Sequence, residues 1–192
     1  SSDMEYHLVA LLLTAGLAAA PCVYGEQSIN WSTVHKQTPA SRGTDKQPAI
    51  RYGHTAAAFK GKLITSHGYY FDREKNFATW LSDTWAMSTK APHRWEQLTP
   101  GIAQEAAKTA YDAGIIPSAP CGRFGHADAT LNDTMYMYGG HDGGISRHGN
   151  QNYEPGFDFD ELWAFNFEAK RWKLIKPLNS LGPGKRYLHG AV

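Results

Sequence analysis

The chain has 192 residues, and its content of 42% apolar and 12% aromatic residues suits a globular protein with a core and excludes a disordered one. The formal net charge is +1 and the Lys and Arg residues are spread along the chain, which excludes a basic surface for nucleic acid or an acidic membrane. Two cysteines, Cys22 and Cys121, supply neither a disulfide framework nor the spacing of a zinc site.

The first 25 residues have the pattern of a signal peptide and leader. Residues 8–20 form an apolar run that is shorter than the roughly 20 residues needed to span a bilayer and that ends in small residues. The run is preceded by no Lys or Arg, and Pro21 disfavours cleavage after Ala20, so cleavage after Gly25 is an equal alternative. The competing interpretation is a buried helix or strand. We expect the secretory pathway, with an extracellular or membrane-associated product.

Two sequons, at Asn30 and Asn132, are candidate glycosylation sites and agree with a secreted glycoprotein. Residues 26–48 follow the leader and are predicted to be an N-terminal linker.

A four-residue motif then recurs three times along the chain. It occupies residues 51–54 (Arg-Tyr-Gly-His), 123–126 (Arg-Phe-Gly-His) and 186–189 (Arg-Tyr-Leu-His). After each of the first two copies, further short apolar blocks follow in the same order, which predicts four short strands per repeat. The turn residues at Gly61 and at 132–133 predict tight hairpins between the first and second strands.

Glycines and tryptophans at fixed places complete the pattern, which is typical of the four-stranded antiparallel blades of a β-propeller. The paired glycines at 139–140 predict a sharp bend, for which the first repeat has Ser66-His67-Gly68. Asp160 is assigned to the position of Asp83. A sandwich of unrelated hairpins is the alternative, which the ordered recurrence disfavours. The residues with a predicted structural role in the repeat are Arg51, Gly53, His54, Trp85, Trp95, Arg123, Gly125, His126, Gly139, Gly140, Trp163 and Trp172.

On these motifs, residues 48–192 resemble the kelch-repeat family. The resemblance implies an all-β fold of kelch-type β-propeller blades, with blade 1 at residues 49–100 and blade 2 at 121–181. Residues 182–192 would begin a third blade, so the propeller is expected to be incomplete. The motifs start at 51, 123 and 186, and these intervals exceed the roughly 50 residues of a kelch unit because of insertions.

The insertions are expected on one face of the propeller. Residues 69–82, 99–120 and 141–159 all follow a second or a fourth strand, and such links emerge on the same side of a blade. Within the middle insertion, residues 101–120, the stretch 102–111 followed by Gly114 predicts a short helix. Insertions on one face often mark a binding face. The candidate binding residues are Tyr69, Tyr70, Phe71, Arg73, Trp80, His141, Asp142, Arg147, His148 and Tyr153.

No catalytic constellation is visible in the sequence. A histidine that recurs once per repeat, as do His54, His126 and His189, is more often structural than a metal ligand, and His67 and His141 are assigned to a second repeated position. Residues 182–185 lack the rest of a phosphate-binding loop. We therefore predict no metal site, no cofactor and no enzymatic activity.

The resemblance implies a secreted or surface-displayed scaffold that binds a protein or glycan partner, with no nucleic acid involved. The alternative is a fragment of a kelch-propeller enzyme, galactose-oxidase-like or a sugar isomerase. Two blades would leave apolar faces around Trp85 and Trp163 open to water, so the chain is expected to be a fragment or to need other blades or chains to complete the ring.

Overall fold

The computed structural model describes residues 47–72, 77–143, 158–176 and 182–191, all of which belong to one compact unit, residues 42–192. The predicted leader, most of the linker and five named candidates lie outside the described residues. Those candidates are Asn30, Arg73, Arg147, His148 and Tyr153. Among the helices in the described ranges, none is long and apolar enough to cross a membrane.

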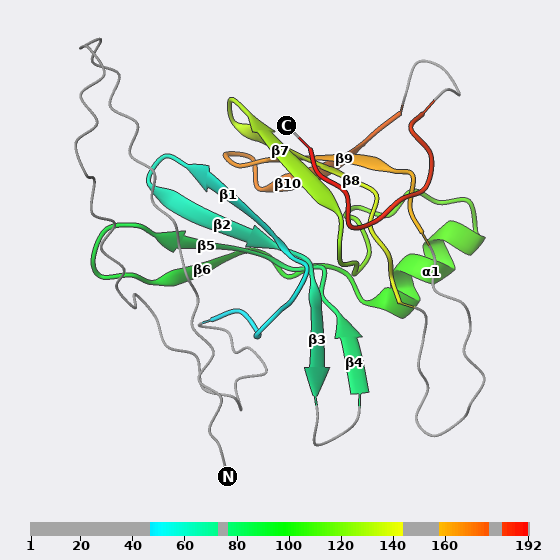
Figure 1. Ribbon diagram of the computed structural model, residues 1–192, viewed down its shortest axis with the longest axis horizontal. Coiled ribbons are helices and arrows are strands. Elements are labelled where there is room, and N and C mark those ends of the chain that lie inside the picture. Colours follow the sequence, from blue (N-terminus) through cyan, green and yellow to red (C-terminus); the bar gives the residue numbers. More distant parts are fainter. Residues whose placement is uncertain (1–46, 73–76, 144–157, 177–181, 192) are drawn as a thin grey trace, which may run out of the picture. The chain divides into compact units, whose positions relative to one another are not determined.

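Two four-stranded antiparallel sheets dominate the structure (Figure 1). The first has the order β1-β2-β5-β6 and consists of β1 (Thr55–Phe59), β2 (Lys62–Ser66), β5 (Thr84–Ser88) and β6 (Trp95–Thr99). The second is a meander of β7 (Ala127–Leu131), β8 (Thr134–Tyr138), β9 (Leu162–Asn166) and β10 (Arg171–Ile175). Each sheet has the arrangement of a β-propeller blade, which confirms the predicted all-β fold of four-stranded antiparallel blades.

Two elements are inserted into this pattern. The hairpin of β3 (Tyr69–Asp72) and β4 (Phe77–Trp80) separates β2 from β5, and the helix α1 (Gln104–Asp112) separates the two sheets in sequence. The helix confirms the prediction for the middle insertion. It ends two residues before Gly114, whose φ of 68° is left-handed, and its Ala107 packs with Cys121 and Phe159.

The hairpin turns follow from local sequence. Lys60 and Gly61 both have positive φ, 44° and 73°, and connect β1 to β2 in a two-residue turn. Asn132 has a φ of 56° between β7 and β8. Both tight hairpins are where the sequence predicts them.

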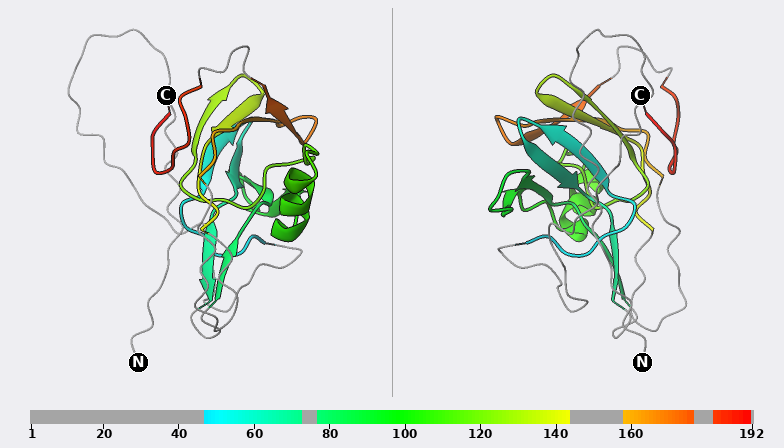
Figure 2. Two further views of the ribbon diagram at one scale, coloured as in Figure 1. Left: turned by 90° about the vertical axis from the view of Figure 1, so that its right-hand side faces the viewer. Right: turned by 60° about the vertical axis from the view of Figure 1, so that its left-hand side comes forward.

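The core lies between the two sheets, which run side by side in all three views (Figures 1 and 2). Ala57 of β1, Ile64 of β2 and Ala86 of β5 are cross-strand partners on one face of the first sheet, and they pack against the inner face of the second sheet. That face contributes Met135, Met137, Trp163, Phe165 and Trp172. Burial of these large side chains is the main favourable term for joining the two sheets.

The expectation that the faces around Trp85 and Trp163 are open to water is wrong. Trp163 is 1% exposed because it points into the core between the sheets, and Trp85 is 2% exposed. Trp95, by contrast, is half-buried.

A buried arginine organises the strand ends of each repeat. Arg51 Nη1 donates to the carbonyl of His67 at 3.0 Å, and its guanidinium pairs with the Asp83 carboxylate. Asp83 in turn accepts a hydrogen bond from Trp85 Nε1 at 2.6 Å. The Arg51 guanidinium therefore connects the Arg-Tyr-Gly-His motif to the end of β2 and to the start of β5.

The second repeat makes the same set of contacts. Arg123 Nη1 donates to the Gly139 carbonyl at 3.1 Å, Arg123 Nη2 donates to Glu161 at 2.9 Å, and Trp163 Nε1 donates to Glu161 at 2.9 Å. The equivalent of Asp83 is thus Glu161, and the assignment of Asp160 to this position is wrong. In both repeats the tryptophan Nε1 donates to a carboxylate two residues earlier in the chain. Asp160 lies three residues before Trp163 and is exposed.

We predict that Arg123→Ala lowers the free energy of unfolding by about 3–5 kcal/mol, because it leaves Glu161 partly buried without its cation. Glu168→Gln, which removes an exposed partner of Lys60, should change it by less than about 0.5 kcal/mol. Urea unfolding followed by tryptophan fluorescence measures both. Equal effects of the two substitutions would contradict the role given to the buried arginine.

Candidate binding face

The long insertions leave the first sheet at one end. Ser82, just after β4, accepts a hydrogen bond from the Ile102 amide at 2.9 Å and donates to the Ile102 carbonyl at 2.8 Å. Ser82 thereby holds the link after β4 against the link that leads to α1. At the opposite end the connections are short, and the Thr89 amide donates to the Gly61 carbonyl at 2.9 Å. One end of the sheet is elaborated and the other is plain.

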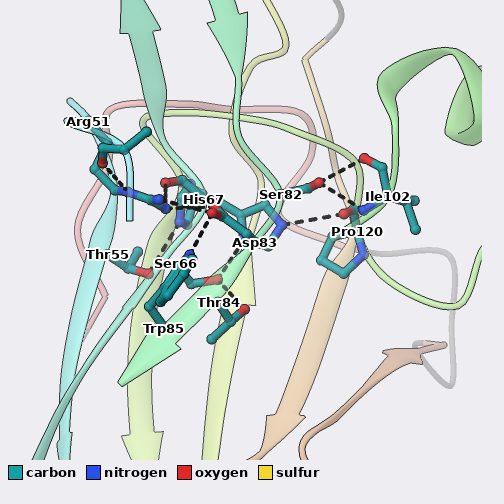
Figure 3. A network of polar contacts seen from close by, with 12 residues as sticks. Arg51, Thr55, Ser66, His67, Ser82, Asp83, Thr84, Trp85, Ile102 and Pro120 are labelled. Atoms are coloured by element: carbon teal, nitrogen blue, oxygen red, sulfur yellow. Dashed lines mark hydrogen bonds and ion pairs between the residues drawn. The ribbon is translucent and has the colours of Figure 1, made fainter. Parts of the chain in front are cut away.

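A chain of buried polar groups supports the elaborated end (Figure 3). Ser66 Oγ lies 2.9 Å from Thr84 Oγ1 and 2.7 Å from His67 Nδ1, and His67 Nε2 lies 3.4 Å from the carbonyl oxygen of Pro120. Because a carbonyl can only accept, Nε2 carries the ring proton and Nδ1 accepts from the Ser66 hydroxyl. The network thus connects β2 and β5 of the first sheet to the segment that enters the second repeat.

His67 occupies a backbone position that normally favours glycine. Its φ is 58°, and Gly139 at the equivalent place of the second repeat has a φ of 69°. The imidazole has no exposed surface and packs edge-on against the rings of Trp172 and His126. Burial, together with the positive charge of Arg123, lowers the pKa of His67 to about 3.

The assignment of His67 and His141 to one repeated position is wrong by two residues. The backbone of Tyr52 bridges Tyr69, and the backbone of Phe124 bridges His141, so that Tyr69 is the equivalent of His141. The equivalent of His67 is Gly139. The first repeat has His67 in place of the first glycine of the pair, so the two histidines are not equivalent.

Consecutive repeats are joined by matching backbone hydrogen bonds. Between the first and second repeats, Gly68 N donates to Arg123 O at 2.8 Å and Gly125 N donates to Gly53 O at 2.9 Å. Between the second and third, Gly140 N donates to Arg186 O at 2.9 Å and Leu188 N donates to Gly125 O at 2.6 Å. We call these four bonds the strand-end belt, since they run across the ends of the strands from repeat to repeat.

Six aromatic rings lie along this belt and are called here the ring cluster: Tyr52, Tyr69, Trp80, Phe124, His141 and Tyr187. Tyr69 lies 5.9 Å from Tyr52 and 5.8 Å from Phe124 between ring centroids. Phe124 continues to His141 at 5.6 Å and to Tyr187 at 6.3 Å. These distances are those of favourable aromatic pairs. Tyr52 and Tyr187, at the two ends, are each 45% exposed.

Trp80 belongs to the cluster but faces the protein. Its indole occupies the space where a side chain would stand on Gly143, and its backbone closely approaches Gly122. Its Nε1 is buried and has no hydrogen-bond partner among the described residues. Trp80 therefore holds the β3–β4 hairpin against the second repeat.

The ring cluster brings together three of the predicted binding residues, Tyr69, Trp80 and His141. Tyr70 and Phe71 are half-buried on β3, and Asp142 is half-buried after His141. The candidate glycosylation site Asn132 is exposed in the β7–β8 turn.

Tyr52, Phe124 and Tyr187 are not among the predicted binding residues, although an aromatic residue occupies the second position of all three motifs. That recurrence was the signal that could have identified them.

The histidines of the repeated motif are held neutral by lowered pKa values. Burial lowers the pKa of His54, His126 and His189, and for His126 the nearby His67 and Arg123 lower it further. Within the described ranges, no group of three or more His, Cys, Asp or Glu side chains could hold a metal ion.

No family model matches the sequence. Among solved structures, that of YjhT aligns with 71% of this chain at 14% sequence identity and a TM-score of 0.43. The aligned part is 30% of the YjhT chain, so this chain spans less than a third of its length.

We predict that acid destabilises the protein through His67. Its pKa is lower in the folded chain than in the unfolded chain, so its contribution is complete above pH 6.5 and decreases as the pH falls towards 3. The unfolding free energy should fall by about 1.4 kcal/mol per pH unit from this group. His67→Asn tolerates the left-handed backbone and removes the titration.

Urea unfolding between pH 6.5 and 5 should therefore show a shallower decline for His67→Asn than for the wild type, whatever their stabilities at neutral pH. Parallel declines would contradict this role of His67.

Proposed function

We propose that this chain is part of a secreted or surface-displayed kelch-repeat scaffold that binds a protein or glycan partner through its elaborated end. The observation that carries the proposal is the ring cluster, which continues across three repeats and presents Tyr52 and Tyr187 half-exposed at its ends. Tyrosines in such positions are over-represented among the residues that dominate binding energy. Secretion is supported by the apolar run of residues 8–20 and by the two sequons.

The ring cluster suits recognition because its centre is fixed before any partner binds. Tyr69 is paired through its backbone with Tyr52 and Trp80, and His141 with Phe124 and Asp158. Trp80 is held between Gly122 and Gly143. A rigid aromatic surface loses little conformational entropy on binding. Near the plain end, the Phe59 ring stacks on Phe167 at 4.5 Å, but Phe167 is 5% exposed and belongs to the core.

The scaffold is proposed to be completed by further blades or chains. Arg186 Nε donates to the Gly184 carbonyl, as Arg51 Nε does to Ala49 and Arg123 Nε does to Cys121. In the first two repeats the guanidinium also meets a carboxylate, but no described carboxylate lies within ion-pair distance of Arg186. The partner that this proposal expects there is a strand with an acidic residue two positions before a tryptophan.

If further chains complete the ring, the isolated chain should elute from a sizing column as an assembly larger than the 21.2 kDa monomer. Elution as a 21.2 kDa monomer would contradict the need for further chains.

The binding role predicts that Tyr52→Ala combined with Tyr187→Ala weakens binding to peptide or glycan arrays by at least about fivefold, because truncated interface tyrosines commonly cost about 1 kcal/mol or more. Leu131→Ala, at an exposed residue in the β7–β8 hairpin, is the matched control and should bind as the wild type does. The function would be excluded if the wild type bound nothing on either array, or if the double variant bound equally well.

A further inference from the structure

The two repeats differ at one pair of positions within the ring cluster. In the first repeat, Tyr69 pairs with Trp80 across the β3–β4 hairpin. In the second, the equivalent pair is His141 with Asp158, and the next residues confirm the register: Leu81 N donates to Gly68 O, and Phe159 N donates to Gly140 O. An aromatic pair has thus been replaced by an imidazole and a carboxylate.

The backbone does not require this replacement. Both pairs close the same bridge, and the bond from Leu81 (2.8 Å) matches that from Phe159 (2.9 Å). In the first repeat, the Tyr69 and Trp80 rings lie 6.0 Å apart and fill the position with apolar surface. The second repeat instead places a carboxylate there, with the Asp158 side chain 41% exposed and the His141 side chain 23% exposed. A charged group at a place that packing can fill with rings indicates a role outside folding.

The pair is oriented by its neighbours. His141 Nδ1 lies 2.7 Å from Asp158 Oδ1, and the imidazole lies 5.1 Å from the Tyr187 ring at an interplanar angle of 34°. It also meets the edge of Phe124 at 5.6 Å. His141 therefore sits between the carboxylate and a tyrosine that is 45% exposed.

Inside this protein, an aromatic ring and a carboxylate together bind a guanidinium, that of Arg123. Arg123 lies with its guanidinium carbon 3.7 Å from the centroid of the Phe159 ring while its Nη2 donates to Glu161. The negative face of an aromatic ring and a carboxylate oxygen both attract a cation. The exposed Tyr187 ring and Asp158 repeat this chemistry at the surface.

Among the described residues, Asp158 is paired with His141 and with no lysine or arginine. The Arg186 guanidinium is directed to the Gly184 and Pro183 carbonyls, and its charge acts on Tyr138 together with the opposite charge of Asp160.

We infer that Tyr187, His141 and Asp158 form a subsite for a cationic side chain, arginine or lysine, presented by a protein partner. This inference rests on the proposed function, because it specifies what the elaborated end recognises. Tyr187 supplies the ring face, Asp158 supplies the charge, and His141 holds both in place.

The test uses acetyl-arginine-methylamide as the probe and acetyl-citrulline-methylamide as its neutral isostere, titrated into the full chain and followed by amide chemical shifts. The arginine probe should bind at least tenfold more tightly than the citrulline probe and should weaken as salt is added. Asp158→Asn should reduce that preference at least fivefold. Glu168→Gln, which removes an exposed carboxylate in the β9–β10 turn, should leave it unchanged.

Equal binding of the two probes, or an unchanged preference in Asp158→Asn, would overturn the inference. If Asp158→Asn unfolds, Tyr187→Leu takes its place, with the same expected loss of arginine preference. Array binding that depends on Tyr52 and Tyr187 but selects neutral peptides or glycans would overturn the cation subsite and leave the binding face standing. Absence of all array binding would contradict both the cation subsite and the proposed binding face.

Discussion

The structure depends on a buried guanidinium that is repeated from one blade to the next. Arg123 has no exposed side-chain surface, yet it satisfies a backbone carbonyl at the end of β8 and a carboxylate at the start of β9. Burying a charge is costly unless it is paired and hydrogen-bonded, so each arginine fixes the geometry of the segments around it. Since those segments carry the strand-end belt, the arginine also determines where the aromatic rings stand.

The ring cluster is a consequence of this arrangement. The arginine and the aromatic residue that follows it point to opposite sides of an extended segment, so the buried salt bridge leaves the ring at the surface end of the blade. The backbone bridges then bring Tyr52 beside Tyr69 and Phe124 beside His141. A purely structural repeat thus generates a continuous aromatic surface, and one altered pair, His141 and Asp158, gives that surface a chemical preference.

Much of the fold could be predicted from the sequence because many residues of the repeat strongly favour one local backbone structure. Turn glycines, the motif arginines and the alternation of apolar residues determine four strands per blade, and the helix before Gly114 follows from its own composition. The equivalence of residues could not be predicted where the two repeats differ in sequence. The arginine hydrogen bonds show that His67 is equivalent to Gly139 and that Asp83 is equivalent to Glu161. The ring cluster was harder still, because Tyr52, Phe124 and Tyr187 are far apart in sequence and meet only through pairing between repeats. Trp80 looked like a binding residue, and only packing against Gly143 shows that it holds the hairpin.

Native-state hydrogen exchange of the belt amides tests most directly whether the repeats are joined as described. The amides of Gly68, Gly125 and Gly140 each donate to a carbonyl of a neighbouring repeat, namely that of Arg123, Gly53 and Arg186. All three glycines are buried. They should exchange as slowly as amides in the centres of β8 and β9, because opening the belt requires the buried arginines to separate from their partners. Exchange as fast as that of the exposed Gly182 and Gly184 would contradict the account, since the blades would then be joined by side-chain packing alone.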